Sequence, residues 1–214
     1  YHDWSWSPMG DGMSTLLVID TSAGTSVAVV RNGALASEHS SDNPLTHAEV
    51  IGSLIQQCLA DAHVSASEIT GVVSGMGPGP FTGLRVGIAA AEAFSVGAGI
   101  PLHPMVSHDA VAWQHFQHSV SPIQVITDAR RKEKFVTAYS GMLNMVPVKA
   151  EGPFLAPADQ VPSFVGTVRE VTDISAGALG CAAYAMLTTN TPFIAAQAIY
   201  LRSPDVTLSK GPKR

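Results

Sequence analysis

The residues best suited to chemistry in this chain lie in one glycine-rich stretch, Gly75 to Gly87, which reads GMGPGPFTGLRVG. It follows an apolar run and leads into an alanine-rich segment, so the pattern predicts a strand, a tight loop and a helix. Glycine accepts positive φ and proline fixes its own, so another backbone or an anion can approach such a loop closely. Free N–H groups near Gly83 and Leu84, with Arg85 one turn into the helix, would attract an anion. The spacing is equally typical of a turn whose glycines and prolines serve only its shape.

We call this candidate segment the motif loop. Its candidate residues are Gly75, Gly77, Pro78, Gly79, Phe81, Thr82, Gly83 and Arg85.

Two acidic turns are the other candidates. Asp20-Thr21-Ser22 follows an apolar run, and its carboxylate and hydroxyls would suit a phosphate or its metal, although such residues also bond their own backbone in turns. Asp128-Ala129-Arg130-Arg131 takes the same place in the second half, but it has no glycine to bring N–H groups against a phosphate. We therefore expect a cleft for an anion or nucleotide that is a poor match to a two-sided ATP clamp. Its candidate residues are Asp20, Thr21, Ser22, Asp128 and Arg130.

No catalytic and no metal-binding residues are expected. The residue four positions after His108 is Ala112, so a His-x-x-x-His pair is missing there, and His115 and His118 have no carboxylate-rich neighbours. A Walker loop and a Gly-x-Ser-x-Gly motif are also missing.

The elements that position these residues form a pattern that repeats. Strands are expected over 15–19, 25–30, 34–40, 71–74, 100–104, 123–127, 135–140 and 168–171. Helices are expected over 46–62, 84–98, 107–118 and 175–186, the first and a short turn at Ser65 opening with capping-box spacing. Residues 147–162 form a segment interrupted by prolines. The repeat predicts an α/β fold of the actin-like ATPase (ribonuclease H-like) type, duplicated into two lobes with the second reduced.

The expected domains are an N-terminal lobe over 13–120 and a smaller C-terminal lobe over 121–214 with a mobile basic tail. Residues 1–12, which carry two of the three tryptophans ahead of Met13, are interpreted as an expression remnant.

Composition excludes several classes of protein. The chain has 214 residues, of which 46% are hydrophobic and 14% charged, so it is folded and not disordered. A net charge of -5 gives no general attraction for nucleic acid. Apolar runs are too short to cross a bilayer, and Cys58 and Cys181 lie far apart, so a reducing cytoplasm is expected.

Four short motifs together resemble the TsaB family, also called YeaZ. They are LLVIDTS (16–22), the motif-loop stretch, DAR with Glu133 (128–133) and YLR (200–202). The family comprises accessory proteins of tRNA threonylcarbamoyladenosine modification at position 37. The resemblance implies no catalytic site and pairing with a TsaD-type transferase, which this chain would activate, and with a TsaE-type ATPase. The loss of the metal pair at Ala112 argues against the M22 peptidase label carried by relatives.

The resemblance also implies a partner surface on the first two long helices, 46–62 and 84–98. Its candidate residues are His47, Ile51, Leu54, Ile55, Gly87, Ala90, Ala93 and Phe94. A homodimer through the same patch is expected in isolation. The chain would need no cofactor of its own, although ADP or ATP at a complex interface stays open, and it would reach tRNA only through the complex and bind no membrane. A small-molecule kinase and a metallopeptidase of the same superfamily are the alternatives.

Overall fold

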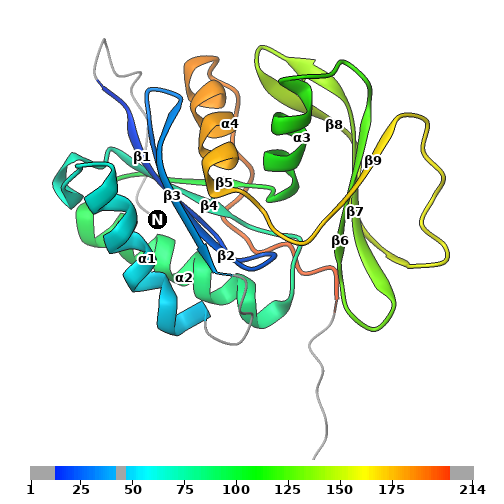
Figure 1. Ribbon diagram of the computed structural model, residues 1–214, viewed down its shortest axis with the longest axis horizontal. Coiled ribbons are helices and arrows are strands. Elements are labelled where there is room, and N and C mark those ends of the chain that lie inside the picture. Colours follow the sequence, from blue (N-terminus) through cyan, green and yellow to red (C-terminus); the bar gives the residue numbers. More distant parts are fainter. Residues whose placement is uncertain (1–12, 42–46, 203–214) are drawn as a thin grey trace, which may run out of the picture.

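The computed structural model describes residues 13–41 and 47–202, with the side chain of His47 left out. Two β-sheets face each other across a pair of helices, and two further helices cover the outer face of the first sheet (Figure 1). The interpreted expression remnant, the residue Thr46 and the basic tail lie outside the described residues. In the described part of the chain, no helix is long and apolar enough to cross a membrane.

The first sheet has five strands in the order β3-β2-β1-β4-β5. They are β1 (Thr15–Asp20), β2 (Thr25–Arg31), β3 (Ala34–Ser41), β4 (Gly71–Gly75) and β5 (Leu102–Met105). The first three strands are antiparallel, whereas β4 and β5 extend β1 in parallel. Every residue of β1 is buried, because helices cover both faces of the sheet there. The predicted strands are confirmed, with ends that differ by one or two residues.

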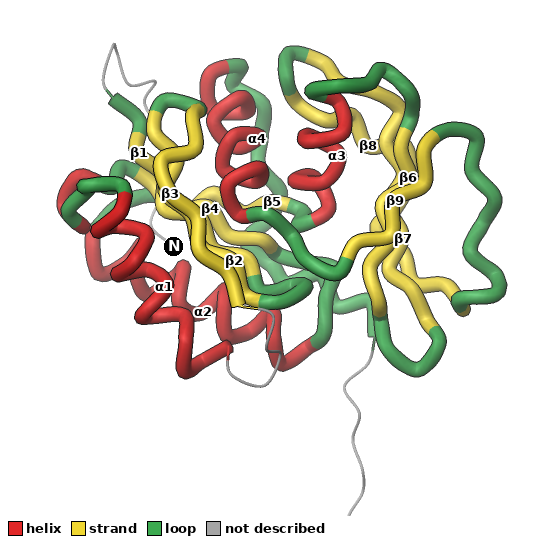
Figure 2. The backbone as a smooth tube through the Cα atoms, in the orientation of Figure 1, coloured by secondary structure: helices red, strands yellow, loops and turns green. Residues whose placement is uncertain are grey.

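Alternate residues of β1 and β2 serve two cores. Leu17 and Ile19 face α1 (His47–Asp61) and α2 (Phe81–Ala98) on the outer side. Leu16 and Val18 face α4 (Ala176–Thr188) on the inner side, so a helix from the C-terminal part of the chain completes the packing of the first sheet. Figure 2 shows the sheet between these two layers of helices.

The second sheet has four strands in the order β8-β7-β6-β9. They are β6 (Ile123–Asp128), β7 (Glu133–Leu143), β8 (Val146–Pro157) and β9 (Thr167–Val171), and α3 (His108–Phe116) packs between this sheet and α4. The order repeats β3-β2-β1-β4 of the first sheet and has no counterpart of β5. The predicted α/β fold of the actin-like type, duplicated with a smaller second sheet, is therefore confirmed. The residue boundaries of the two lobes stay a prediction.

Strand β8 departs from the sequence expectation, because its prolines do not interrupt it. Pro147 and Pro157 are opposite Met142 and Glu133 of β7, and both lie within the strand. β8 is at the edge of the sheet and pairs only with β7 among the described strands. An edge strand tolerates proline since one side of its backbone needs no ladder partner.

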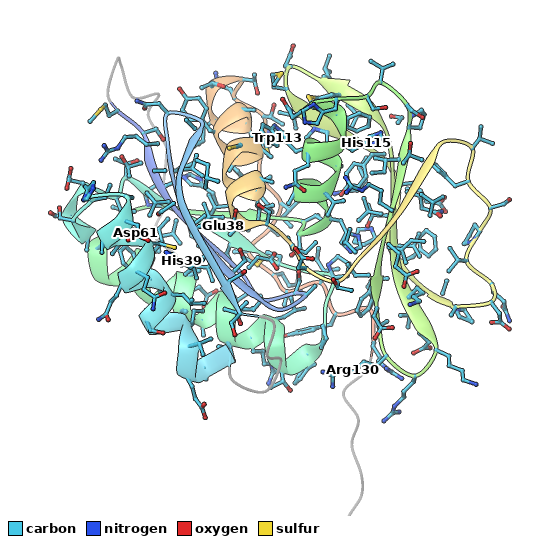
Figure 3. The ribbon with its side chains drawn as sticks, in the orientation of Figure 1. Glu38, His39, Asp61, Trp113, His115 and Arg130 are labelled. Carbon is cyan, nitrogen blue, oxygen red and sulfur yellow. The ribbon has the colours of Figure 1, made fainter. Side chains whose placement is uncertain are left out.

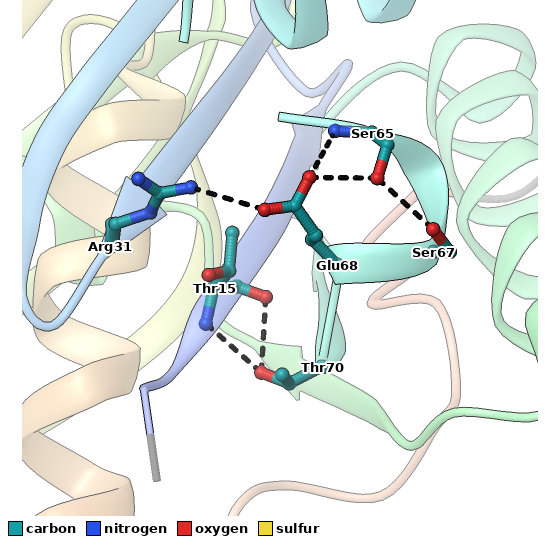
Figure 4. A network of polar contacts seen from close by, with 6 residues as sticks. All are labelled: Thr15, Arg31, Ser65, Ser67, Glu68 and Thr70. Carbon is teal, nitrogen blue, oxygen red and sulfur yellow. Dashed lines mark hydrogen bonds and ion pairs between the residues drawn. The ribbon is translucent and has the colours of Figure 1, made fainter. Parts of the chain in front are cut away.

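The predicted capping box at Ser65 and Glu68 is confirmed. The Glu68 carboxylate accepts from the Ser65 backbone N–H at 2.8 Å, and its other oxygen lies 3.9 Å from the Arg31 guanidinium (Figure 4). Beside it, the Thr70 hydroxyl accepts a hydrogen bond from the Thr15 N–H at 3.0 Å and donates one to the Thr15 carbonyl at 3.1 Å. These contacts fix the approach to β4 beside the start of β1.

The start of α4 is held by Glu38 of the edge strand β3. The Glu38 carboxylate accepts from the Gly177 N–H at 3.1 Å and from the hydroxyls of Ser26 and Ser175 at 3.0 and 3.1 Å. Figure 3 shows Glu38 beside the first turn of α4. A carboxylate at the N-terminal end of a helix also interacts favourably with the helix dipole. Through these contacts, Glu38 joins the C-terminal part of the chain to the first sheet.

Glu38→Ala is expected to lower the free energy of unfolding by about 1 to 2 kcal/mol, because three donors lose their acceptor and the helix loses a charge at its N-terminus. Urea denaturation followed by circular dichroism measures the change. Glu151→Ala, at an exposed position of β8, is the control and should change stability little. An equal loss in both variants would contradict the role of Glu38.

Candidate functional site

The motif loop packs against the first acidic turn of this same chain. A Cβ on Gly79 would lie 2.7 Å from the Ser22 carbonyl oxygen and 2.8 Å from its Cα, and a Cβ on Gly75 would collide with the Asp20 carboxylate. Both glycines are therefore required by a close approach of two segments. From the sequence, either another backbone segment or an anion could approach the motif loop. In the structure, the backbone of Ser22 lies against it.

Several polar groups of the first acidic turn form hydrogen bonds inside the chain, whereas Asp20 Oδ2 is buried without a hydrogen-bond partner among the described residues. Asp20 is 1% exposed, and its Oδ1 accepts from the Ser22 N–H at 2.8 Å and hydroxyl at 2.5 Å. Burial raises the pKa of Asp20, while the hydroxyls of Ser107 and Ser22 oppose that shift. The Thr21 hydroxyl donates to the Gly83 carbonyl at 2.8 Å and lies 3.2 Å from the Gly87 N–H, which donates to it. A ligand at this turn would have to displace these contacts.

The anion-attracting helix start predicted near Gly83 and Leu84 needs correction. Helix α2 begins at Phe81, with Pro80 as its N-cap, and the Leu84 N–H already donates to the Pro80 carbonyl at 3.1 Å. The predicted start at Leu84 was too late because proline is well suited to the first positions of a helix. The Arg85 guanidinium carbon lies 3.7 Å from the centroid of the Phe81 ring, and this contact already occupies Arg85.

The second acidic turn lies at the surface. Asp128 is exposed and lies 3.5 Å from the Lys134 ammonium group, and Arg130 is exposed at the tip of the β6–β7 turn, where Figure 3 shows it. The backbone of Arg130, Arg131 and Lys132 is left-handed, with φ of 62°, 51° and 61°. Such a run is unusual for residues with side chains. That this turn and Asp20 share one nucleotide cleft stays a prediction.

Three of the recognised motifs meet through the segment Ile199 to Arg202, which we call the tail strap. The Ile199 N–H donates to the Met76 carbonyl of the motif loop at 2.8 Å. The Tyr200 ring lies 4.8 Å from the Phe81 ring, and its hydroxyl accepts from Arg85 Nε at 3.1 Å. The strap thus connects the motif loop and the first turn of α2.

The other end of the tail strap holds the β6–β7 turn. Arg202 Nη1 donates to the Ala129 carbonyl at 3.0 Å, and Nη2 lies 3.1 Å from the Glu133 carboxylate. Glu133 closes the turn, since its N–H donates to the Arg130 carbonyl and its carbonyl accepts from the Ala129 N–H, both at 3.0 Å. Arg202 therefore supports a turn whose backbone conformation is costly by itself.

Arg202→Met is expected to open this turn, so that its amide hydrogens exchange at least about tenfold faster because the guanidinium contacts are lost. Hydrogen–deuterium exchange with mass spectrometry over residues 128–134 measures the effect. Arg169→Met, at an exposed position of β9, is the matched control and should leave this peptide unchanged. Unchanged exchange in the Arg202 variant would show that the strap does not support the turn.

The histidine at the start of α3 connects two structural elements. His108 is fully buried, with Nδ1 2.8 Å from the Thr137 hydroxyl and Nε2 2.9 Å from the Thr127 hydroxyl. Burial lowers its pKa to about 3, with a smaller contribution from the charge of Lys149. Both ring nitrogens thus serve to join α3 to the second sheet. In the described residues, no group of three or more histidine, cysteine or acidic side chains is placed to hold a metal ion.

The predicted partner surface on α1 and α2 needs revision at several residues. Ile51 and Leu54 are 8% and 7% exposed and belong to the core under α1, and Gly87 is buried against Thr21. These three residues cannot face a partner, because the apolar stripe of α1 packs on its own sheet. Ile55, Ala90 and Phe94 are partly buried against the same core, and the side chain of His47 lies outside the described residues.

Of the predicted partner residues, Ala93 is exposed, and it belongs to a row of small and apolar side chains on the outer side of α2. We call this row the α2 stripe; it consists of Ala89, Ala93, Val96 and Gly97. Their spacing places them on one face of the helix. Val96 is 78% exposed, and a Cβ on Gly97 would meet no atom within 4 Å. The stripe is open to a second helix, which small residues allow to approach closely.

The sequence did not predict the contacts of Arg202 with Ala129 and Glu133, or the hydrogen bonds of the Thr21 hydroxyl with α2. Both contacts join residues at least 62 positions apart, so no local pattern encodes them. The available signal was the presence of charged residues of opposite sign in the DAR and YLR motifs.

Comparison with known proteins finds matches whose descriptions name threonylcarbamoyl modification of tRNA. The family model described as TsaD, tRNA N6-adenosine threonylcarbamoyltransferase, matches residues 42–149, or half of the chain. A protein of Mycobacterium tuberculosis is 37% identical over 130 residues, which cover 59% of this chain and 60% of the relative. The tRNA threonylcarbamoyladenosine biosynthesis protein TsaB of Haemophilus influenzae is 33% identical over 126 residues, covering 56% and 52%. The chain thus spans little more than half the length of these relatives.

A solved structure shares the fold. YeaZ from Pseudomonas aeruginosa superposes with a TM-score of 0.75 over 88% of this chain and 100% of that protein, at 20% sequence identity.

Proposed function

Because the chain belongs to the TsaB (YeaZ) family, we propose that it is a non-catalytic accessory subunit of tRNA threonylcarbamoyladenosine modification that pairs with and activates a TsaD-type transferase. The two named relatives from Haemophilus influenzae and Bacillus subtilis are biosynthesis proteins of this modification. The proposal carries their role to this chain and adds the surface through which it acts.

The observation that carries the proposal is the α2 stripe. It exposes small and apolar side chains on an 18-residue helix, which is long enough for several turns of contact with a partner helix. Alanine and glycine let two helix backbones come close, and Val96 supplies apolar area to bury. The same stripe would serve a homodimer when the transferase is absent.

The absence of a catalytic role is supported by the internal use of the polar residues. Ser22 bonds to Asp20, Thr21 bonds to α2, and His108 bonds to two threonines. These side chains fit the first lobe as structural groups and do not fit an open phosphate clamp. We propose that the chain needs no cofactor of its own, with any ADP or ATP held at the interface of the complex. A TsaE-type ATPase would join that complex, and tRNA would be bound through it.

Isothermal titration of the full chain with a purified TsaD-type transferase tests the proposal. We expect a complex with a dissociation constant in the micromolar range or below, and no heat from titration of the chain alone with magnesium ATP. Lack of binding to the transferase, or tight ATP binding by the isolated chain, would overturn it.

A further inference from the structure

A cavity of about 540 Å³ lies at the edge of the first sheet, away from the motif loop and the acidic turns. The last two turns of α2, the edge strand β5, the end of α4 and the loop that follows it form its walls. Most of the lining is apolar, from Val96, Leu102, Met186 and Phe193 among others. This size and lining are typical of small-molecule sites.

One side chain in this cavity is buried and lacks a polar partner. His103 of β5 is 6% exposed and forms no hydrogen bond with any described residue, although its ring lies 4.7 Å from that of Phe193. Burial lowers the pKa of His103 to about 4, so the ring is neutral at physiological pH. A neutral imidazole offers one acceptor nitrogen and one N–H donor. A polar side chain that has no protein partner and lines a cavity is available to hydrogen-bond a ligand there.

The electrostatics of the cavity select the charge of that ligand. Two helices, α2 and α4, end at the cavity, and the C-terminal end of a helix carries partial negative charge. Glu92 is the only lysine, arginine, aspartate or glutamate among the described residues that line it. Among the described residues, no lining cation or helix N-terminus offsets this negative field. This arrangement favours a cationic ligand over an anionic one such as a nucleotide or a phosphate.

We propose that this cavity binds a small organic cation with a flat apolar body, such as an aromatic amidinium or ammonium compound. The apolar body would stack beside His103 and Phe193, and the cationic group would face Glu92 and the helix ends. Binding at this site can be measured on the isolated chain, and Val96 belongs both to the cavity lining and to the α2 stripe.

Three probes of equal shape test the proposal: benzamidine, benzamide and benzoate, which are cationic, neutral and anionic. Each is titrated into the full chain labelled with ¹⁵N and ¹³C at histidine, and the ring signals of His103 are followed by NMR. We expect benzamidine to shift the His103 signals and to bind at least about tenfold more tightly than benzamide, with benzoate showing no binding.

Two charge-removing variants complete the test. Glu92→Gln should weaken benzamidine binding about tenfold, whereas Glu49→Gln, at an exposed acid of α1 outside the cavity, should leave it unchanged. The proposal is overturned if benzamidine leaves the His103 signals unmoved, if benzoate binds as tightly as benzamidine, or if the two variants behave alike.

Discussion

We expect Ala93→Glu to lower the affinity for the proposed TsaD-type transferase by at least about 100-fold, or about 2.7 kcal/mol, while the chain stays folded. Ala93 is exposed in the α2 stripe, so the isolated protein accommodates a larger side chain in solvent. In a close helix pair the same carboxylate would be buried without a partner and would hold the two backbones apart. The loss therefore falls on pairing and not on folding.

Titration calorimetry of the variant with the transferase measures this loss, and circular dichroism verifies the fold. Ala158→Glu, an equal change at an exposed site after β8, is the control and should bind as the parent chain does. Ala90 is a poorer test, because it is partly buried against the core under α1 and its substitution would disturb the fold. Full affinity in the Ala93 variant would place the partner surface elsewhere.

We expect Gly79→Ala to lower the free energy of unfolding by about 3 kcal/mol. The added methyl group would meet the backbone oxygen and Cα of Ser22 at 2.7 and 2.8 Å, and backbone atoms cannot turn away as a flexible side chain can. The motif loop and the first acidic turn would have to separate, which would also disturb the contact of Thr21 with Gly83 and Gly87.

Urea denaturation of Gly79→Ala and Gly52→Ala compares two glycines with opposite surroundings. A Cβ on Gly52, within α1, would meet no atom within 4 Å, so alanine there should stabilise the chain by about 0.5 to 1 kcal/mol. A loss of stability in Gly79→Ala together with a gain in Gly52→Ala would confirm that the close approach of Ser22 requires glycine at position 79. A neutral effect of Gly79→Ala would contradict the packing described.

Local sequence patterns predicted most elements of this fold. The Ser65–Glu68 capping box and the alanine-rich helix α2 each follow from interactions within a few residues, and the structure contains both. The repeat of strand, acidic turn and strand correctly indicated two related sheets, because the same order of strands recurs in both.

Long-range contacts decided what the sequence could not predict. The apolar spacing of Ile51 and Leu54 would fit packing against a partner or against the chain's own sheet. Only the three-dimensional packing shows that both face the sheet. Arg85 in the motif loop suggested an anion site, but its guanidinium group already contacts the ring of Phe81 and donates to the hydroxyl of Tyr200. Tyr200 lies 115 positions further along the chain, beyond the reach of any periodicity.

We propose that this chain acts as a docking subunit and not as an enzyme. The most direct test of this proposal is reconstituted tRNA modification with a TsaD-type transferase and a TsaE-type ATPase, measuring threonylcarbamoyladenosine formed with and without this chain. We predict that product forms only when the chain is present, is lost with Ala93→Glu and persists with Ala158→Glu. Equal product without the chain, or full product with Ala93→Glu, would contradict the account.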